Sequence, residues 1–187
     1  MKAKTVIISI LLFLCFSHAA QAQKMSVSTD MVSWAYFGTV NAELGASVAQ
    51  HFSLMAGARY NPWDYKTRLD KDMYTHQTTA YAGVRWWPWY VFSGWWAGAK
   101  VQYSSAAETG MWRPALEEKE SAGVGLSGGY TLMLHEKINL EFSAGIWGGR
   151  HYRYRLYECP ECMALRTDQP RNFLALDDLS ISIMFIF

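Results

Sequence analysis

Charged residues are scarce in this chain: of its 187 residues, 18% are Asp, Glu, Lys or Arg, whereas soluble globular domains average about 25%. Neither sign of charge dominates. Seventeen Lys and Arg against sixteen Asp and Glu give a formal charge of +1, so there is no basic field to attract nucleic acid or an acidic substrate. Hydrophobic residues make up 51% of the chain and are spread along it, which argues against a disordered chain and favours one domain.

A long apolar run is also missing from most of the chain. A helical membrane span needs about 20 apolar residues, and the richest segment, Trp86 to Ala99, is interrupted by Pro88, Ser93 and Gly94. The apolar stretch from Val6 to Phe16 is too short as well. The sequence therefore predicts no transmembrane helix.

Residues 1–22 have the organisation of a secretory signal peptide. A basic end, an apolar stretch and a small-x-small cleavage site follow one another: Lys2 and Lys4, Val6 to Phe16, and Ala20-Gln21-Ala22. A lipoprotein signal would use Cys15, but Leu12-Phe13-Leu14 before it lacks the small residues of such a site. We expect export, with residues 23–187 forming the mature domain.

Beyond this segment, apolar residues alternate with small or polar ones, which is the period of β-strands with one apolar face. The pattern is clearest at the C-terminus, where five apolar residues share one face: Leu179, Ile181, Ile183, Phe185 and Phe187. It recurs in seven further segments: 26–37, 41–48, 53–60, 80–87, 95–104, 121–130 and 138–146. A change of parity near Met31 and Val32 predicts a β-bulge in the first of them.

Eight antiparallel strands can close into a barrel, which leaves no unpaired backbone edge in lipid. We predict an all-β fold: an eight-stranded antiparallel up-and-down transmembrane β-barrel with short periplasmic turns and longer extracellular loops, in the outer membrane of a Gram-negative bacterium. The long loops are expected at 61–78, 106–120 and 157–173. A soluble sandwich is disfavoured, because the face opposite the apolar one carries mainly Gly, Ser and Ala.

Aromatic residues are expected in two belts, as interfacial anchors of a barrel. The belt near the short turns would contain Phe52, Trp86, Trp87, Trp89, Tyr90, Phe92, Trp95 and Tyr130. The belt near the long loops would contain Trp34, Tyr60, Trp63, Tyr103, Trp147 and Tyr152. Phe185 and Phe187 end the chain as the expected insertion signal for the barrel-assembly machinery.

Six charged residues are predicted to lie inside the barrel as a lumen charge network: Asp30, Glu43, Arg59, Arg85, Lys100 and Glu141. Unpaired, each charge would cost several kcal/mol. An eight-stranded barrel has room inside for little more than side chains, so we expect salt bridges that fill the interior. The alternative is a narrow conduction path gated by the same pairs.

Cys159 and Cys162 are an even pair in an exported domain and are expected to form a local loop disulfide. A metal site or free thiols remain an alternative, although one Cys-x-x-Cys pair supplies only two of the four ligands of a structural zinc site. Redox catalysis is disfavoured, because the motif lacks an α/β setting. The glycine pattern at 123–128 lies inside a strand, so no cofactor is predicted.

A basic surface patch is a further candidate site, with these residues: His151, Arg153, Arg155, Arg166 and Arg171. Arginine matches phosphate groups in two-point contacts, so the patch could hold lipopolysaccharide phosphate or an acidic glycan. The alternative is a solvated extension of the strand. A lipid-modifying enzyme would need a paired Ser and His at the outer rim, and nothing in the spacing pairs His76, His151, Ser104 and Ser105.

Several motifs resemble the domain of unknown function 3575 family of Bacteroidota: Asn61-Pro62-Trp63, Arg85-Trp86-Trp87-Pro88-Trp89, the strand from Gly123 to Tyr130, and Tyr157-Glu158-Cys159-Pro160-Glu161-Cys162. The similarity covers the whole mature chain. It implies an outer-membrane barrel, sometimes in a fimbria-associated context, and no established activity or catalytic residue. Met163 departs from the family, which often has Gly after the second cysteine.

The sequence thus predicts a small non-enzymatic outer-membrane barrel with a structural, adhesion or surface-assembly role through its loops. The expected partners are outer-membrane lipid and lipopolysaccharide, the barrel-assembly machinery and a surface protein such as a fimbrial component. An outer-membrane lipid-modifying enzyme is the alternative, and a narrow channel comes third. Neither a metal nor nucleic acid is expected.

Overall fold

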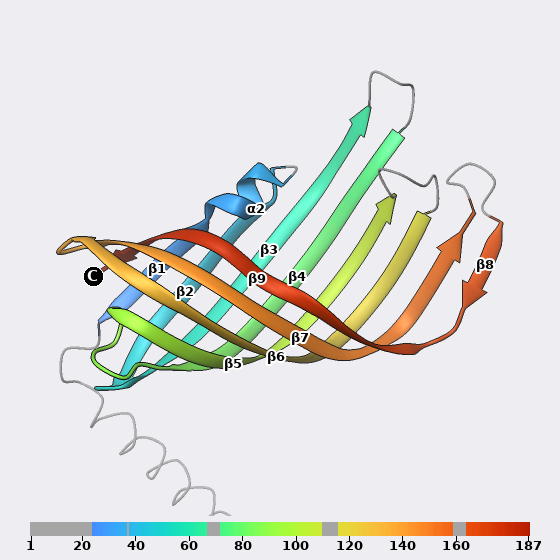
Figure 1. Ribbon diagram of the computed structural model, residues 1–187. Coiled ribbons are helices and arrows are strands. Elements are labelled where there is room, and N and C mark those ends of the chain that lie inside the picture. Colours follow the sequence, from blue (N-terminus) through green and yellow to red (C-terminus); the bar gives the residue numbers. More distant parts are fainter. Residues whose placement is uncertain (1–23, 37, 67–71, 110–115, 159–163) are drawn as a thin grey trace, which may run out of the picture.

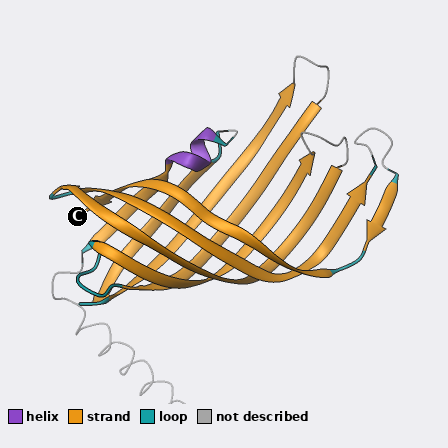
Figure 2. Cartoon of the chain, viewed as in Figure 1, coloured by secondary structure: helices purple, strands orange, loops and turns teal. Residues whose placement is uncertain are grey.

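The computed structural model describes residues 24–36, 38–66, 72–109, 116–158 and 164–187 (Figure 1). The elements in chain order are β1 (Met25–Asp30), α2 (Met31–Ala35), β2 (Val40–Ala49), β3 (Phe52–Lys66), β4 (Asp72–Trp86), β5 (Gly94–Thr109), β6 (Leu116–His135), β7 (Ile138–Tyr157), β8 (Leu165–Asp168) and β9 (Arg171–Ile186). In these residues α2 is the one helix among strands (Figure 2). No described helix has the length and apolar character needed to cross a membrane.

Eight of the strands close into an antiparallel barrel. β1 to β7 pair in chain order, β7 pairs with β9, and β9 returns to β1. Two backbone hydrogen bonds of 2.9 Å, from Met25 N to Phe187 O and from Phe187 N to Met25 O, join the first and last strands at their ends. The short β8 pairs only with β7 in the described chain. The predicted all-β, eight-stranded antiparallel barrel is therefore confirmed.

The two ends of the barrel differ. At the short-turn end, β2–β3 and β6–β7 are joined by two residues each, and β4–β5 by residues 87–93. At the other end, which we call the hairpin end, β3 to β7 rise past β2 and β9 (Figure 1). We call this part the extended wall; it comprises residues 60–66, 72–78, 105–109, 116–120 and 152–157.

The prediction of long loops was wrong, because most of two of these segments belongs to the strands of the extended wall. β3 and β4 pair as far as Lys66 and Asp72, and β5 and β6 as far as Thr109 and Leu116, so most of 61–78 and 106–120 is strand. The third predicted loop, 157–173, contains β8. Apolar alternation stops in these segments, but the ladder of backbone hydrogen bonds continues without it.

The strand alternation separates an apolar outer face from a polar interior. Large apolar side chains on the outer face are 40% to 88% exposed: Leu44, Leu54, Val84, Val101, Val124, Leu126, Ile146, Leu174, Leu176 and Leu179. Buried polar side chains fill the inner face: Ser28, Ser53, Thr79, Gln102, Ser127, Asn139, Glu141 and Ser182. This is the reverse of a soluble fold.

The alternation of apolar and polar residues breaks near Met31 because the chain forms the short helix α2 there, and not the predicted bulge. Asp30 is the N-cap of α2, and its carboxylate accepts hydrogen bonds from the backbone N–H groups of Val32 (3.0 Å) and Ser33 (3.1 Å). An aspartate in this position satisfies donors that the first helical turn leaves unpaired. Partial burial and the nearby Glu108 carboxylate raise the pKa of the Tyr36 phenol.

Candidate functional site

The barrel interior holds two charge clusters in the middle of the strands. In the first, Lys100 Nζ lies 2.6 Å from Asp177 Oδ2 and 2.7 Å from Asp178. Arg59 reaches the same two carboxylates, at 3.2 Å from Asp177 and 2.9 Å from Asp178. Two bases thus share two acids, and the Lys100 side chain is only 1% exposed.

The second cluster is centred on Arg85. Its guanidinium lies 2.7 Å from Glu43 Oε1 and 3.3 Å from Glu141 Oε1. Thr131 Oγ1 donates to Glu141 at 3.0 Å, and Tyr81 Oη donates to Glu43 at 2.9 Å. The Tyr81 ring also lies 4.8 Å from Lys100 Nζ, so this tyrosine connects the two clusters.

Five of the six residues of the predicted lumen network lie in these clusters: Glu43, Arg59, Arg85, Lys100 and Glu141. Asp30 is a correction. It is buried, but its carboxylate caps α2 and also accepts from Ile181 N at 3.2 Å. No ion pair to Asp30 is found within the described residues, because backbone N–H groups already take up its oxygens.

Asp177 and Asp178 were missed by the sequence prediction. Two consecutive residues of a regular strand face opposite sides, yet both of these carboxylates contact Lys100. The reason is a β-bulge: Asp178 has φ of 57°, and the register against β7 shifts between Ser143 and Gly145. Asparagine and aspartate tolerate this left-handed backbone better than most residues.

An apolar cluster closes the lumen at the short-turn end. Trp87, Phe92, Trp96 and Met184 are 0–4% exposed and pack together, and Trp87 Nε1 donates to Ser53 Oγ at 2.9 Å. The Arg85 guanidinium stacks on Trp96 at 4.1 Å from the ring centroid. We call these four side chains the plug. Charged clusters and plug together fill the barrel interior.

Trp87 and Phe92 were predicted in the outer aromatic belt, and this was wrong. Trp87 follows Trp86 and therefore faces the opposite side of the wall, into the barrel. Phe92 lies in a turn with φ of 65°, which directs its ring to the plug. Trp147 also faces inward, where it packs against Phe173 at 4.5 Å between ring centroids.

Almost no free space remains between the charge clusters. The cavity bounded by Glu43, Arg59, Arg85, Lys100 and Glu141 has a volume of about 20 Å³. That is roughly the space of a single water molecule. Within the described residues, this cavity therefore holds no more than about one water molecule beside the two clusters.

The predicted basic patch is divided between two faces. A register shift between β6 and β7 places Tyr152 in a bulge, with Ser121 opposite His151 and Glu120 opposite Arg153. After His151, the residues that would have pointed into the barrel therefore point outward, and the reverse. Arg153 and Arg155 face outward and pair with Glu120 (2.9 Å) and Asp168 (3.5 Å).

The other members of the predicted patch lie elsewhere. His151 is buried on the inner face and stacks on Phe173 at 4.2 Å between ring centroids. The Arg171 guanidinium lies over the Tyr154 ring, at 4.0 Å from the ring centroid. Its Nη2 atom also lies 4.0 Å from Glu117 Oε1. Arg166 is exposed on β8. These side chains form no common surface for a phosphate group.

His151 does pair with a serine that the spacing did not indicate. Its Nδ1 lies 2.5 Å from Ser121 Oγ, but the two residues are 7% and 1% exposed.

The described chain has no group of three His, Cys, Asp or Glu side chains suited to a metal. Cys159 and Cys162, predicted to form a loop disulfide, and the predicted signal peptide 1–22 lie outside the described residues. Phe185 and Phe187 are exposed on the outer face at the short-turn end.

Comparisons with known proteins identify the family of this chain. Residues 7–187 match the model of a family described as "Protein of unknown function (DUF3575)". No curated protein matches the chain significantly. No solved structure does so either. Because the match extends over nearly the whole chain, the protein belongs to the DUF3575 family.

Proposed function

We propose that this protein is a non-conducting, non-enzymatic barrel of the outer membrane with a structural or surface-assembly role. The observation that carries the proposal is the outer face. Leu174, Leu176 and Leu179 are 75%, 88% and 76% exposed on it. Apolar surface in water costs about 25 cal/mol per Å², whereas in a bilayer the same side chains are solvated by lipid.

Closure of the sheet supports the same placement. A strand edge cannot remain unpaired in lipid, and only a closed barrel leaves none. The exposed tyrosines Tyr60 and Tyr103 end the apolar band at the hairpin end, and Trp86, Trp89 and Trp95 end it at the short-turn end. Aromatic side chains prefer both interfaces of a membrane. The hairpin end then faces outside, as is usual for outer-membrane barrels.

The extended wall is the part available for surface assembly or adhesion. It begins at Tyr60, where the apolar band ends, and carries charges on its outer face, including Glu118, Glu120 and Arg153. A fimbrial component or another surface protein would meet this wall first. The described residues offer no other element of comparable length outside the apolar band.

Conductance measured in planar bilayers tests the proposal. The wild-type barrel and Glu141→Ala are both expected to give no selective channel openings, because removing one carboxylate leaves Arg85 with Glu43 and leaves the plug in place. Glu108→Ala, in the extended wall, is the matched control. A Glu141→Ala barrel that remained as stable as the wild type and conducted selectively would refute the proposal.

A lipid-modifying enzyme is the second candidate, because Ser121 and His151 form a nucleophile–base contact. Two observations favour the non-enzymatic alternative. Ser121 faces the interior and is 1% exposed, and His151 is covered by Phe173 on one face. A lipid ester would need an open path to the serine oxygen.

A further inference from the structure

The outer face of the extended wall contains a hollow of about 450 Å³. Two adjacent rows of outward-facing residues line it, each row running across neighbouring strands in register. The first row is Tyr60, Thr78, Ser105, Glu120 and Arg153. The second is Pro62, His76, Ala107 and Glu118. We call this feature the outer hollow.

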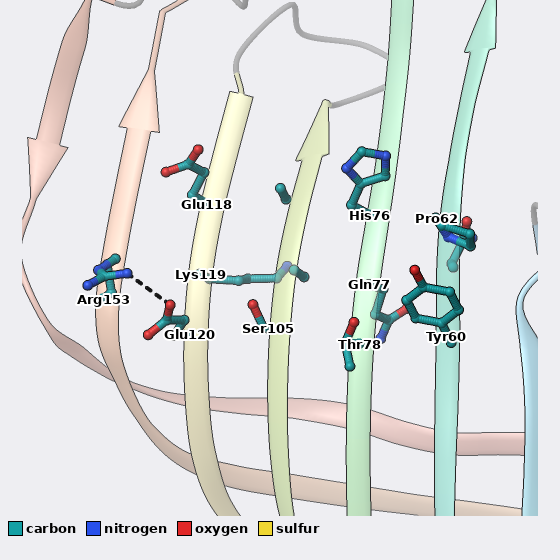
Figure 3. Close-up of a pocket in the computed structure, with 13 residues that line it drawn as sticks. Tyr60, Pro62, His76, Gln77, Thr78, Ser105, Glu118, Lys119, Glu120 and Arg153 are labelled. Carbon is teal, nitrogen blue, oxygen red and sulfur yellow. Dashed lines mark hydrogen bonds and ion pairs between the residues drawn. The ribbon is translucent and has the colours of Figure 1, made fainter.

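The strand parity shows that the hollow is on the outside. In each of β3, β4, β5 and β6, two outward-facing residues line the hollow. The residue between each pair also borders it, but its side chain points to the inner face of the wall. The outer surface of a barrel is convex, so a hollow there must come from differences in side-chain size. Ser105 and Ala107 of β5 are the small residues of the lining. Larger side chains of β4 and β6, including His76 and Glu120, lie on either side of Ser105 (Figure 3).

The two sides of the hollow differ in chemistry. Tyr60 and His76 lie on one side, and Glu118, Glu120 and Arg153 lie on the other (Figure 3). Arg153 Nη1 donates to Glu120 at 2.9 Å, and Tyr157 Oη donates to Glu118 at 3.5 Å. The Tyr60 side chain is 54% exposed and offers a ring face beside the floor.

The position of the hollow restricts what can reach it. The next outward row toward the short-turn end contains Ala80, Tyr103 and Ala122, and the row after it contains Val101 and Val124. The hollow therefore begins where the apolar band ends. On the proposed membrane placement, it lies at the level of the outer-leaflet headgroups.

Hydroxyl groups match this lining better than phosphate does. Two carboxylates would repel a phosphate, and the two cations of the lining are already paired, Arg153 with Glu120 and Lys119 with Glu108. A sugar hydroxyl can donate to a carboxylate and accept from a guanidinium or from a serine or threonine hydroxyl. An aromatic ring can cover the apolar face of a sugar ring, and the volume lies in the usual range for small-molecule sites.

We propose that the outer hollow binds the saccharide part of an outer-leaflet glycolipid. This rests on the proposed membrane placement and goes beyond it by naming a ligand class and a site. The sugar lies over Ser105 and Ala107, against Tyr60, with its hydroxyl groups on Glu118, Glu120 and Arg153. Its lipid part extends along the apolar outer face below.

The test measures binding of rough-type lipopolysaccharide to the full-length mature barrel in detergent micelles, by native mass spectrometry. Ala107→Phe fills the hollow from an outward position and is expected to weaken binding at least tenfold. Ala97→Phe, an exposed outward alanine at the other end of β5, is the matched control and should bind as the wild type does. Equal binding by the two variants would overturn the proposal.

Charge removal separates a saccharide from a phosphate. Glu118→Gln with Glu120→Gln keeps the shape of the hollow and is expected to weaken binding several-fold, because two strong acceptors are lost. Tighter binding by this double variant would overturn the saccharide assignment and indicate a phosphate group.

The source of the sugar is tested with the core oligosaccharide released from the same lipopolysaccharide. It should bind at least tenfold more weakly than the intact glycolipid, since it lacks the lipid part. Equal affinity would overturn the glycolipid assignment in favour of a soluble glycan. Failure of the membrane placement is distinguishable, because the wild-type protein would then form no detergent-resistant folded band.

Discussion

Lys100→Ala is expected to lower the free energy of unfolding by about 3–5 kcal/mol, the usual cost of breaking a buried ion pair. The Lys100 ammonium contacts both Asp177 and Asp178, and its side chain is 1% exposed. Without it, two adjacent carboxylates share only Arg59 inside the barrel. The loss is measured by urea unfolding of the barrel in lipid vesicles.

Lys119→Ala is the control for that experiment. Lys119 forms an ion pair with Glu108 at 3.2 Å on the extended wall, where the two side chains are 28% and 29% exposed. Pairs of this kind contribute about 0–1 kcal/mol. If both variants lost the same free energy of unfolding, the lumen clusters would not be the stabilising element that we describe.

Trp87→Ala is expected to destabilise the barrel by about 3–5 kcal/mol, because it removes the largest fully buried side chain and leaves a cavity in the plug. It also deprives Ser53 Oγ of the Trp87 Nε1 hydrogen bond. The same urea unfolding in vesicles measures the change.

Trp89→Ala supplies the comparison at the same turn. Trp89 is 56% exposed and lies outside the plug. We expect its replacement to cost much less, about 1 kcal/mol. A smaller effect for Trp87→Ala than for Trp89→Ala would mean that Trp87 faces the membrane interface, as the belt prediction had it.

Much of the fold could be predicted because strand alternation has a period of two. The number of barrel strands and the inward positions of Arg59, Arg85 and Glu141 all follow from it. The same alternation puts Trp87 on the face of Arg85, and both side chains are buried, so alternation is a better guide here than the belt prediction. A tryptophan near a turn is therefore not sufficient evidence for an interfacial anchor.

What could not be predicted depends on single-residue irregularities. One extra residue reverses the parity of everything after it. The bulge at Asp178 brings Asp177 into the lumen, and the bulge at Tyr152 sends Arg153 outward while His151 stays inside. Neither bulged residue, Asp178 nor Tyr152, has Gly or Pro directly beside it in the sequence.

The outer hollow was out of reach of the sequence for a different reason. Its lining combines residues of β3 to β7 that are far apart in the chain and meet only through strand register. Alternation within one strand says nothing about which residue of the next strand lies beside it. Likewise, alternation alone makes Asp30 a lumen charge. Its role as the N-cap becomes clear only from the short helix α2 that follows it.

Heat modifiability on a gel shows whether the chain forms a closed barrel in a membrane. The mature protein is extracted from membranes or refolded into detergent and run on a gel with and without boiling, with circular dichroism in parallel. We predict a β-rich spectrum and a compact, detergent-resistant band that shifts only on boiling. A protein that stays soluble without detergent and runs at one position in both lanes would show that the chain forms no such barrel.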